Sequence, residues 1–316
     1  MSTLIGMMVG SRQSTITLVR NSLRTILDRI GDDVMIAVAI APYLPKDFLH
    51  LVADIERMYP GKILTFPLYE GSWAQFANLV IDMSMDFKWT IFSHDDVQLI
   101  SDDFIPVMEG MLDQKRDTLG WISFLDWDYL RSGWAPSIRE GFHIDAVREN
   151  AWSRKKIHNY HNLPENWYSP GMPKECLQSL PWDIPEKPIR CHAPFSHLIA
   201  IKSDTLRTVI RKCENWSPVS LMVDEDWGLT ALKNGLFNIW IPQLAYCHMR
   251  TLGGTRASPL IQQYGKFVHN QFRSKWGFMH KCIYTPSELK DIRRRFSRTN
   301  IPWSMDRRSY EWDYVQ

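Results

Sequence analysis

Along the N-terminal part of the chain, continuous apolar runs alternate with amphipathic stretches. Residues 3–9 and 34–40 are apolar at nearly every position, which is typical of strands buried on both faces. Over residues 16–30 and 48–58, apolar residues recur at the spacing of a helix that packs one face on a sheet. This alternation predicts parallel strands joined by crossover helices.

The same alternation continues further along the chain. We expect a strand at 63–66, a helix at 74–85 and a strand at 89–93 that runs directly into a polar turn. In sheets of this class, ligands bind beyond the carboxyl ends of the strands, which is where these turns fall. The pattern therefore predicts an α/β fold with a Rossmann-like, mainly parallel central sheet, helices on both faces and a ligand site at one sheet edge.

The second half of the chain does not continue this regular alternation of strands and helices. After a strand at 121–125, residues 126–194 hold many prolines and aromatic residues and show little periodicity. An excursion of this length in a compact domain is usually functional. Regular elements then return in the order strand, helix, helix, strand, helix and helix, at residues 197–201, 206–212, 226–233, 237–241, 259–276 and 286–296.

Composition narrows the class of protein. Apolar residues make up 45% and charged residues 23% of the 316 residues, which excludes a disordered or fibrous chain. No run reaches the roughly 20 apolar residues of a membrane-spanning helix, and no secretory leader stands at Met1. The five cysteines are scattered, as in reduced thiols, so we expect a cytoplasmic protein. The 14 tryptophans, all but Trp73 and Trp89 at or beyond Trp121, indicate a ligand with flat or ring-shaped faces.

Two adjacent carboxylates, Asp95 and Asp96, follow the buried strand at 89–93. A hard divalent cation such as Mg²⁺ or Mn²⁺ takes oxygen ligands and leaves positions open for a substrate's phosphates. A strand end presents such ligands rigidly. The alternative is that one of the two carboxylates caps the helix that begins near Phe104.

A second acidic group, Asp224-Glu225-Asp226, precedes Trp227 at a predicted helix start. Carboxylates at this position are favoured by the helix dipole, which needs no further function. The functional alternative is a general base beside an aromatic platform for a sugar-like acceptor. His248 ends a later apolar stretch and is, taken alone, more typical of a structural residue.

These sites belong to an ordered series of features that spans about residues 3–110 and 190–250. The series resembles the family 2 inverting nucleotide-sugar glycosyltransferases, which have the GT-A fold. Its order is specific, whereas no single member is. It consists of the strand at 4–9, the stretch Ser22-Leu23-Arg24-Thr25-Ile26-Leu27, Gly71, Ala77 and Asn78, the segment Ile91-Phe92-Ser93-His94-Asp95-Asp96, and then Glu225-Asp226, Gly235, Pro242 and His248.

The resemblance implies roles for the acidic residues. Asp95 would bind the Mn²⁺ or Mg²⁺ ion that bridges the donor diphosphate, Asp96 would assist it, and His248 would complete the site. Asp226 would be the base that deprotonates the acceptor hydroxyl, and Glu225 would orient the acceptor or the base. The cation would stabilise the leaving nucleoside diphosphate while the base activates the nucleophile.

The resemblance also implies a donor pocket and leaves the nucleotide open. Ser93 stands where the metal motif has its first Asp, and residues 39–42 lack the Asp that reads uracil in many family members. Arg12 suits a contact with a base or a phosphate, although a solvated side chain is equally ordinary. The residues placed in this pocket are Ser11, Arg12, Gly71, Asn78, Ser93 and His94.

The aromatic excess falls in the half that should define the acceptor. We expect Trp127, Trp134 and Trp227 to face it, because aromatic faces bind sugar rings and also stack on exposed bases. The alternative for most of these rings is packing of the insertion against the sheet. In the basic tail, Arg293-Arg294-Arg295 could meet a membrane surface, nucleic-acid phosphates or only solvent.

The predicted organisation is one GT-A domain with two halves and an extension. Residues 1–120 would bind the donor, residues 121–254 with the insertion 126–194 would bind the acceptor, and residues 255–316 would form a helical, basic extension. We expect a metal-dependent inverting glycosyltransferase that acts on a saccharide of a surface polymer or glycoconjugate. Three alternatives stay open: transfer to a modified nucleic-acid base, a nucleotidyltransferase of similar fold, and a glycan-binding module without turnover.

Overall fold

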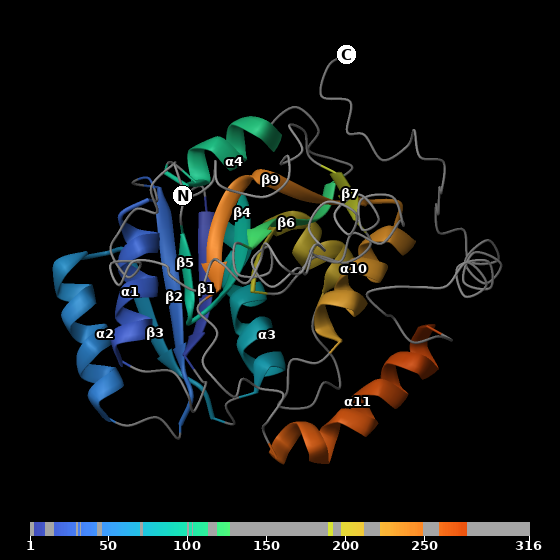
Figure 1. Ribbon diagram of the computed structural model, residues 1–316, viewed down its shortest axis with the longest axis horizontal. Helices are drawn as coiled ribbons and strands as arrows, with labels where there is room; N and C mark the ends of the chain where they lie inside the picture. The colour runs from blue at the N-terminus through green and yellow to red at the C-terminus, as the bar shows by residue number, and fades with distance from the viewer. Residues whose placement is uncertain are drawn as a thin grey trace, which may run out of the picture.

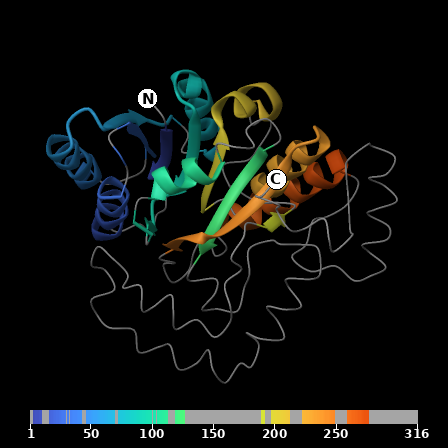
Figure 2. The ribbon, with the colours of Figure 1, turned by 90° about the horizontal axis from the view of Figure 1, so that it is seen from above.

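The computed structural model describes residues 3–9, 16–29, 31, 33–42, 46–69, 72–99, 101–102, 104–112, 119–126, 189–191, 197–211, 222–248 and 259–276. In this part of the chain the strands form one nine-stranded sheet with helices on both faces (Figures 1 and 2). The α/β class predicted from the alternation of apolar runs is confirmed.

The N-terminal half of the sheet is entirely parallel. Strand β1 lies between β2 and β4, and β2 pairs with β3, so the order is β3-β2-β1-β4. The sequence pattern predicted these strands and the helices between them to within a few residues. The elements are β1 (Thr3–Val9), α1 (Ile16–Leu27), β2 (Val34–Ile40), α2 (Lys46–Met58), β3 (Ile63–Pro67), α3 (Trp73–Met83), the short helix η1 (Ser84–Asp86) and β4 (Trp89–His94).

The second half of the sheet is mixed. Strand β8 lies antiparallel to both of its neighbours, β4 and β6, whereas β6 and β9 are parallel. The strands are β5 (Val97–Leu99), β6 (Leu119–Asp126), β7 (Ile189–Cys191), β8 (Leu198–Lys202) and β9 (Phe237–His248). The helices are α4 (Phe104–Leu112), α9 (Ser203–Thr205), which continues into the π-helical turn η5 (Leu206–Ile210), α10 (Val223–Lys233) and α11 (Pro259–Trp276).

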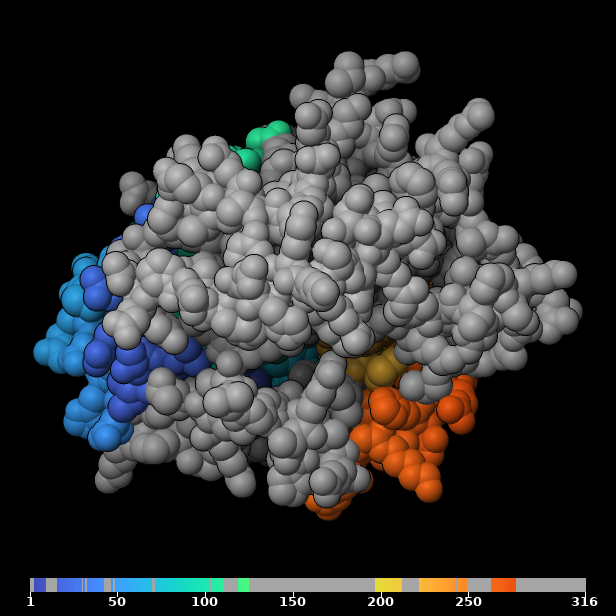
Figure 3. Space-filling model, in the orientation of Figure 1, coloured from blue at the N-terminus to red at the C-terminus, as the bar shows by residue number. Residues whose placement is uncertain are grey.

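Two hydrophobic clusters fill the two faces of the sheet. One joins α1, α2 and α4 to the sheet, as Val19, Val52 and Phe104 illustrate, and the other joins α3, η5 and α10. Alternate residues of β1 serve the two clusters, since Leu4 belongs to the second and Ile5 to the first. Helices α1 and α2 and helix α11 lie at opposite sides of the face seen in Figure 3.

Asn238 on β9 fastens α10 to the sheet. Its side-chain amide donates to the backbone oxygen of Gly228 at 2.8 Å, and its Oδ1 accepts from the backbone nitrogen of Trp121 at 2.9 Å. Gly120 makes room for it, because a Cβ at that position would lie 2.5 Å from Asn238 Oδ1. Helix α10 is therefore held against β6 and β9 by a buried polar bridge.

Two further findings bear on the predictions. The pair Asp95-Asp96 forms the turn between β4 and β5, so neither carboxylate caps α4. Among the described residues, no helix is long and apolar enough to cross a membrane. The helix expected at residues 286–296 lies outside the described part of the chain.

Candidate functional site

The turn after β4 brings a carboxylate to the end of β9. Strand β5 pairs antiparallel with β9, with Val97 opposite His248, so the residue before Val97 lies beside this histidine. Asp96 Oδ1 is 3.2 Å from His248 Nε2, and both side chains are largely buried. Asp95 is buried as well. The structure therefore places the Asp96 carboxylate in contact with His248.

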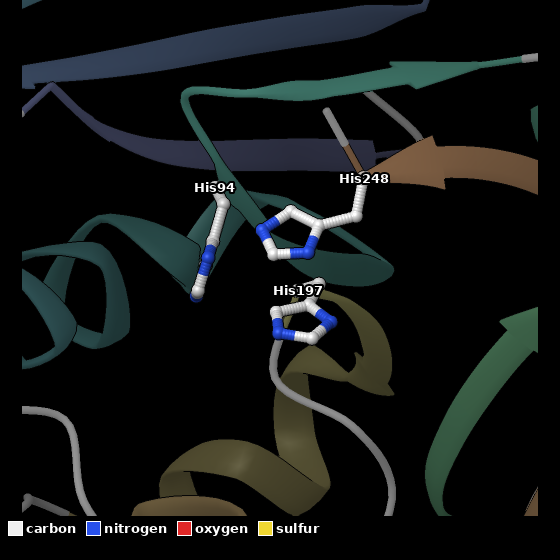
Figure 4. A group of neighbouring side chains, drawn as sticks. All are labelled: His94, His197 and His248. Carbon is white, nitrogen blue, oxygen red and sulfur yellow. The ribbon is translucent and has the colours of Figure 1, made fainter. Parts of the chain in front are cut away.

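Three histidines converge at this sheet edge (Figure 4). They are His94 at the end of β4, His197 directly before β8 and His248 at the end of β9, and one nitrogen of each lies within 4.8 Å of the others. The rings of His197 and His248 stack with centroids 3.8 Å apart, and the ring of His94 lies edge-on to both, at 5.0 and 5.6 Å. The backbone nitrogen of His94 also donates to the carbonyl oxygen of His197 at 2.9 Å.

His197 was missed from the sequence for a physical reason. A strand that runs antiparallel begins at the edge where its parallel neighbours end, so the residue before β8 meets the residues that follow β4 and β9. A buried strand reads as an apolar run whichever way it points. The sequence signal, a histidine next to the apolar run at 198–201, gains its meaning only with the strand direction.

The charge states at this edge suit a cation. Burial lowers the pKa of His94 to about 4, which leaves its ring neutral at neutral pH. Burial opposes ionisation of Asp96, but the hydrogen bond and positive charge of His248, with a smaller contribution from His94, outweigh it and hold the pKa of Asp96 below its usual range. An ionised carboxylate among imidazoles is a donor set that fits a divalent metal ion.

The second acidic group lies in the first turn of α10, and its last member, Asp226, is paired with two donors. Asp226 is 3% exposed. Lys275 Nζ lies 2.8 Å from Asp226 Oδ1 and donates to Oδ2 at 2.9 Å, and Trp276 Nε1 donates to Oδ1 at 2.7 Å. Both partners come from the last turn of α11. Glu225, expected to assist Asp226, is half-buried beside it.

Trp227 does not form the open platform expected from the sequence. The ring is 2% exposed, stacks on Trp121 with centroids 4.8 Å apart and an interplanar angle of 4°, and contacts Phe92 at 5.2 Å. Its faces are thus used for packing in the core. This contact ties the start of α10 to β4, two residues before His94, and so places the acidic helix start close to the histidine-bearing strand.

The structure describes three of the residues expected in the donor pocket, Asn78, Ser93 and His94. Ser93 is fully buried, and its hydroxyl donates to the backbone oxygen of His94 at 3.0 Å. His94 belongs to the histidine cluster described above, and Asn78 is half-buried on α3. The remaining residues expected to bind donor or acceptor lie outside the described residues: Ser11, Arg12, Gly71, Trp127 and Trp134.

Comparison with known proteins finds similarity in the fold but not in the sequence. Neither a family model nor a curated protein sequence matches this chain significantly. Solved structures do match.

A crystal structure of GalNAc-T7 with UDP, GalNAc and Mn²⁺ matches with a TM-score of 0.55 at 11% identity, over 94% of this chain and 54% of that one. The mannosyltransferase PcManGT from Pyrobaculum calidifontis, in complex with GDP-Man and Mn²⁺, matches with a TM-score of 0.53 at 12% identity, over 95% of this chain and 70% of that one. S. aureus TarS 1–349 in complex with UDP-GlcNAc matches with a TM-score of 0.55 at 8% identity, over 97% of this chain and 74% of that one.

These similarities establish the fold. The chain has the GT-A architecture of nucleotide-sugar glycosyltransferases, as the ordered motifs predicted. It spans about half the length of the GalNAc-T7 chain that it matches.

Proposed function

We propose that this chain is a metal-dependent glycosyltransferase that moves a sugar from a nucleotide-sugar donor to a hydroxyl acceptor with inversion at the anomeric carbon. The observation that carries the proposal is the pair formed by Asp96 and His248, 3.2 Å apart at the strand-end edge of a GT-A sheet. Ligands of open α/β sheets bind at this edge. The structurally similar proteins named above hold UDP, GDP-Man or UDP-GlcNAc, and two of them also hold Mn²⁺.

Asp96 and His248 are the residues that would hold the cation. When bound there, a divalent cation neutralises charge on the diphosphate of the leaving nucleotide. Asp96 supplies a negative charge, and the imidazole of His248 would supply a nitrogen lone pair once it has released its proton to make way for the cation. Asp95, which the resemblance assigned as the principal ligand, is buried in the same turn as Asp96 and remains a proposed ligand of the cation.

Asp226 is the proposed general base. A carboxylate offers about four lone-pair positions. Lys275 and Trp276 direct three short contacts at its oxygens and so leave acceptance capacity for one further hydroxyl. The two donors hold the carboxylate in one orientation, which a base needs in order to meet the acceptor at a defined angle.

The proposed transfer needs only the nucleotide sugar and the acceptor hydroxyl as reactants. The acceptor oxygen forms a bond to the anomeric carbon from the face opposite the diphosphate, while the bond from that carbon to the diphosphate oxygen breaks. The acceptor's proton passes to Asp226, and the electron pair of the broken bond leaves with the nucleoside diphosphate. Attack from the opposite face inverts the anomeric configuration.

The proposed acceptor is a saccharide of a glycoconjugate or surface polymer. The candidate base lies in the half of the chain that follows residue 120, which is the half assigned to the acceptor from the sequence. Trp276 is half-buried and bonded to Asp226, so it is the aromatic ring proposed to pack against the acceptor sugar.

An anomer-resolved assay tests the proposal. The full chain is incubated with nucleotide sugars, saccharide acceptors and Mn²⁺, and separately with sugar phosphates, nucleoside triphosphates and Mn²⁺, and the products are followed by phosphorus and proton NMR. The proposal predicts a nucleoside diphosphate and a sugar of inverted configuration, both lost on adding a chelator. Retained configuration would refute inversion, and release of pyrophosphate from a sugar phosphate and a nucleoside triphosphate would identify a nucleotidyltransferase instead.

A further inference from the structure

We propose that His197 is a metal ligand of this chain, and that His94, His197 and His248 together with Asp96 form an imidazole-rich site that selects Mn²⁺ or a similar transition-metal ion over Mg²⁺. The inference rests on the proposed function only in placing the donor's cation at this edge. It adds a ligand that the motif series does not contain and a preference that the motif leaves open.

The spacing of the donor atoms fits a single ion. Nitrogens bound to one transition-metal ion at roughly 2.0–2.1 Å lie at most about 4.2 Å apart, on opposite sides of the ion. The three histidines present nitrogens within 4.8 Å of one another, and Asp96 joins this group through its contact with His248. To bind one ion, the side chains must rotate so that the stacked rings of His197 and His248 separate and their nitrogens converge. The 3.2 Å between Asp96 Oδ1 and His248 Nε2 is close to the separation of two ligands at right angles on such an ion.

The backbone holds these side chains in place. Each histidine stands at the end or the start of a central strand, and His94 and His197 are joined by a backbone hydrogen bond of 2.9 Å. Asp96 is held by the β4–β5 turn, whose Val97 is in register with His248. Four donor groups thus come from three neighbouring parts of one sheet edge, which is the rigid kind of support that a metal site requires.

The donor set discriminates between cations. Mg²⁺ takes oxygen ligands in a nearly ideal octahedron, whereas imidazole nitrogen suits zinc, copper, iron and nickel. Mn²⁺ shares the preference of Mg²⁺ for oxygen but, as a transition-metal ion, also binds imidazole. One carboxylate with three imidazoles offers Mg²⁺ a single preferred donor. The same set gives a transition-metal ion up to four ligands and, with octahedral coordination, two positions for the diphosphate oxygens of the donor.

The competing explanation is that His197 only packs. Its ring lies against that of His248 with centroids 3.8 Å apart, and such a stack holds its neighbour in place without binding metal. The His197→Phe variant separates the two roles because phenylalanine keeps a flat ring for the stack and removes both nitrogens. His50→Phe is the matched control, since His50 is exposed on α2 and distant from the cluster.

The experiment measures metal binding directly. The full chain is freed of metal with a chelator and titrated with MnCl₂, while free Mn²⁺ is counted from its electron paramagnetic resonance signal. The expected results are one tight site, loss of at least about tenfold in Mn²⁺ affinity in His197→Phe, and no change in His50→Phe. An approximately hundredfold excess of Mg²⁺ should leave the bound Mn²⁺ in place.

A second readout does not depend on any variant. Pulsed electron paramagnetic resonance of Mn²⁺ bound to the unmodified chain should show couplings to imidazole nitrogen, with fewer coupled nitrogens in His197→Phe. Wild-type affinity in His197→Phe, displacement of Mn²⁺ by equal Mg²⁺, or a single coupled imidazole in the unmodified chain would each overturn the inference.

The inference and the proposed function fail separately. If Mn²⁺ binds through several imidazoles but no nucleotide sugar binds or reacts, the metal site stands and the glycosyltransferase proposal falls. If nucleotide sugars react as well with Mg²⁺ as with Mn²⁺, the glycosyltransferase proposal stands and the metal preference is refuted. If the His197→Phe variant transfers sugar and binds Mn²⁺ as tightly as the unmodified chain, the glycosyltransferase proposal stands and the role of His197 as a ligand is refuted.

Discussion

Trp276 Nε1 donates a hydrogen bond to Asp226 Oδ1 over 2.7 Å and thereby joins the last turn of α11 to the first turn of α10. Lys275 Nζ donates to the same carboxylate, which is almost fully buried. Both donors to this carboxylate therefore come from the end of one helix. A buried charge is tolerated only when it is paired and hydrogen-bonded. The end of α11 therefore belongs to the candidate site.

Lys275→Met should impair both folding and transfer. It removes the only cation seen next to Asp226 in the described part of the chain and leaves the buried carboxylate with Trp276. We expect the free energy of unfolding to fall by about 1–3 kcal/mol, from urea titration, because hydrogen bonds to charged groups contribute in that range. Lys266→Met, at an exposed position of the same helix, is the control and should be neutral.

Asp226→Asn should abolish transfer while donor binding persists. Asparagine keeps the shape of the side chain but accepts no proton, so the rate should drop by about 10²–10⁴-fold. Asp47→Asn, which changes an exposed carboxylate in the first turn of α2, is the control and should have full activity. If the two variants behaved alike in a transfer assay, Asp226 would serve only the helix dipole and the assignment of the base would fall.

Gly120→Ala should loosen the attachment of α10. A Cβ at this position would lie 2.5 Å from Asn238 Oδ1 and 2.9 Å from Ala231 Cβ, so the bridge must shift. Overpacking of this kind typically costs about 1–3 kcal/mol of unfolding free energy. Gly110→Ala, on α4 with nothing within 4 Å of the added Cβ, should be neutral or slightly stabilising in the same thermal unfolding experiment. Equal effects of the two substitutions would contradict the role of the bridge.

The sequence predicted the parallel half of the sheet well and the mixed half less well. Strands such as β1 and β2 are buried on both faces and joined by amphipathic helices, so their apolar runs and crossovers can both be recognised. Strand β5 has only three residues, too few for any periodic signal. The direction of β8 depends on its neighbours, which is why the position of His197 was not predictable.

The tryptophans illustrate the limit of composition as a guide. Trp89, Trp121, Trp227 and Trp240 are almost fully buried and pack the core, so these four rings are not open to a ligand. Trp276, which the sequence did not single out, is the one that contacts the proposed base. Its role depends on the position of α11 against α10, a tertiary relationship that no local pattern encodes.

The most direct test of the proposed function is calorimetric titration of the full chain with a panel of nucleotide sugars, in Mn²⁺ and in chelator. We expect that at least one nucleotide sugar binds in Mn²⁺, that chelator removes this binding, and that Asp96→Asn weakens it at least about tenfold. Binding that is indifferent to both the cation and Asp96, or the absence of binding across the panel, would contradict the proposed function.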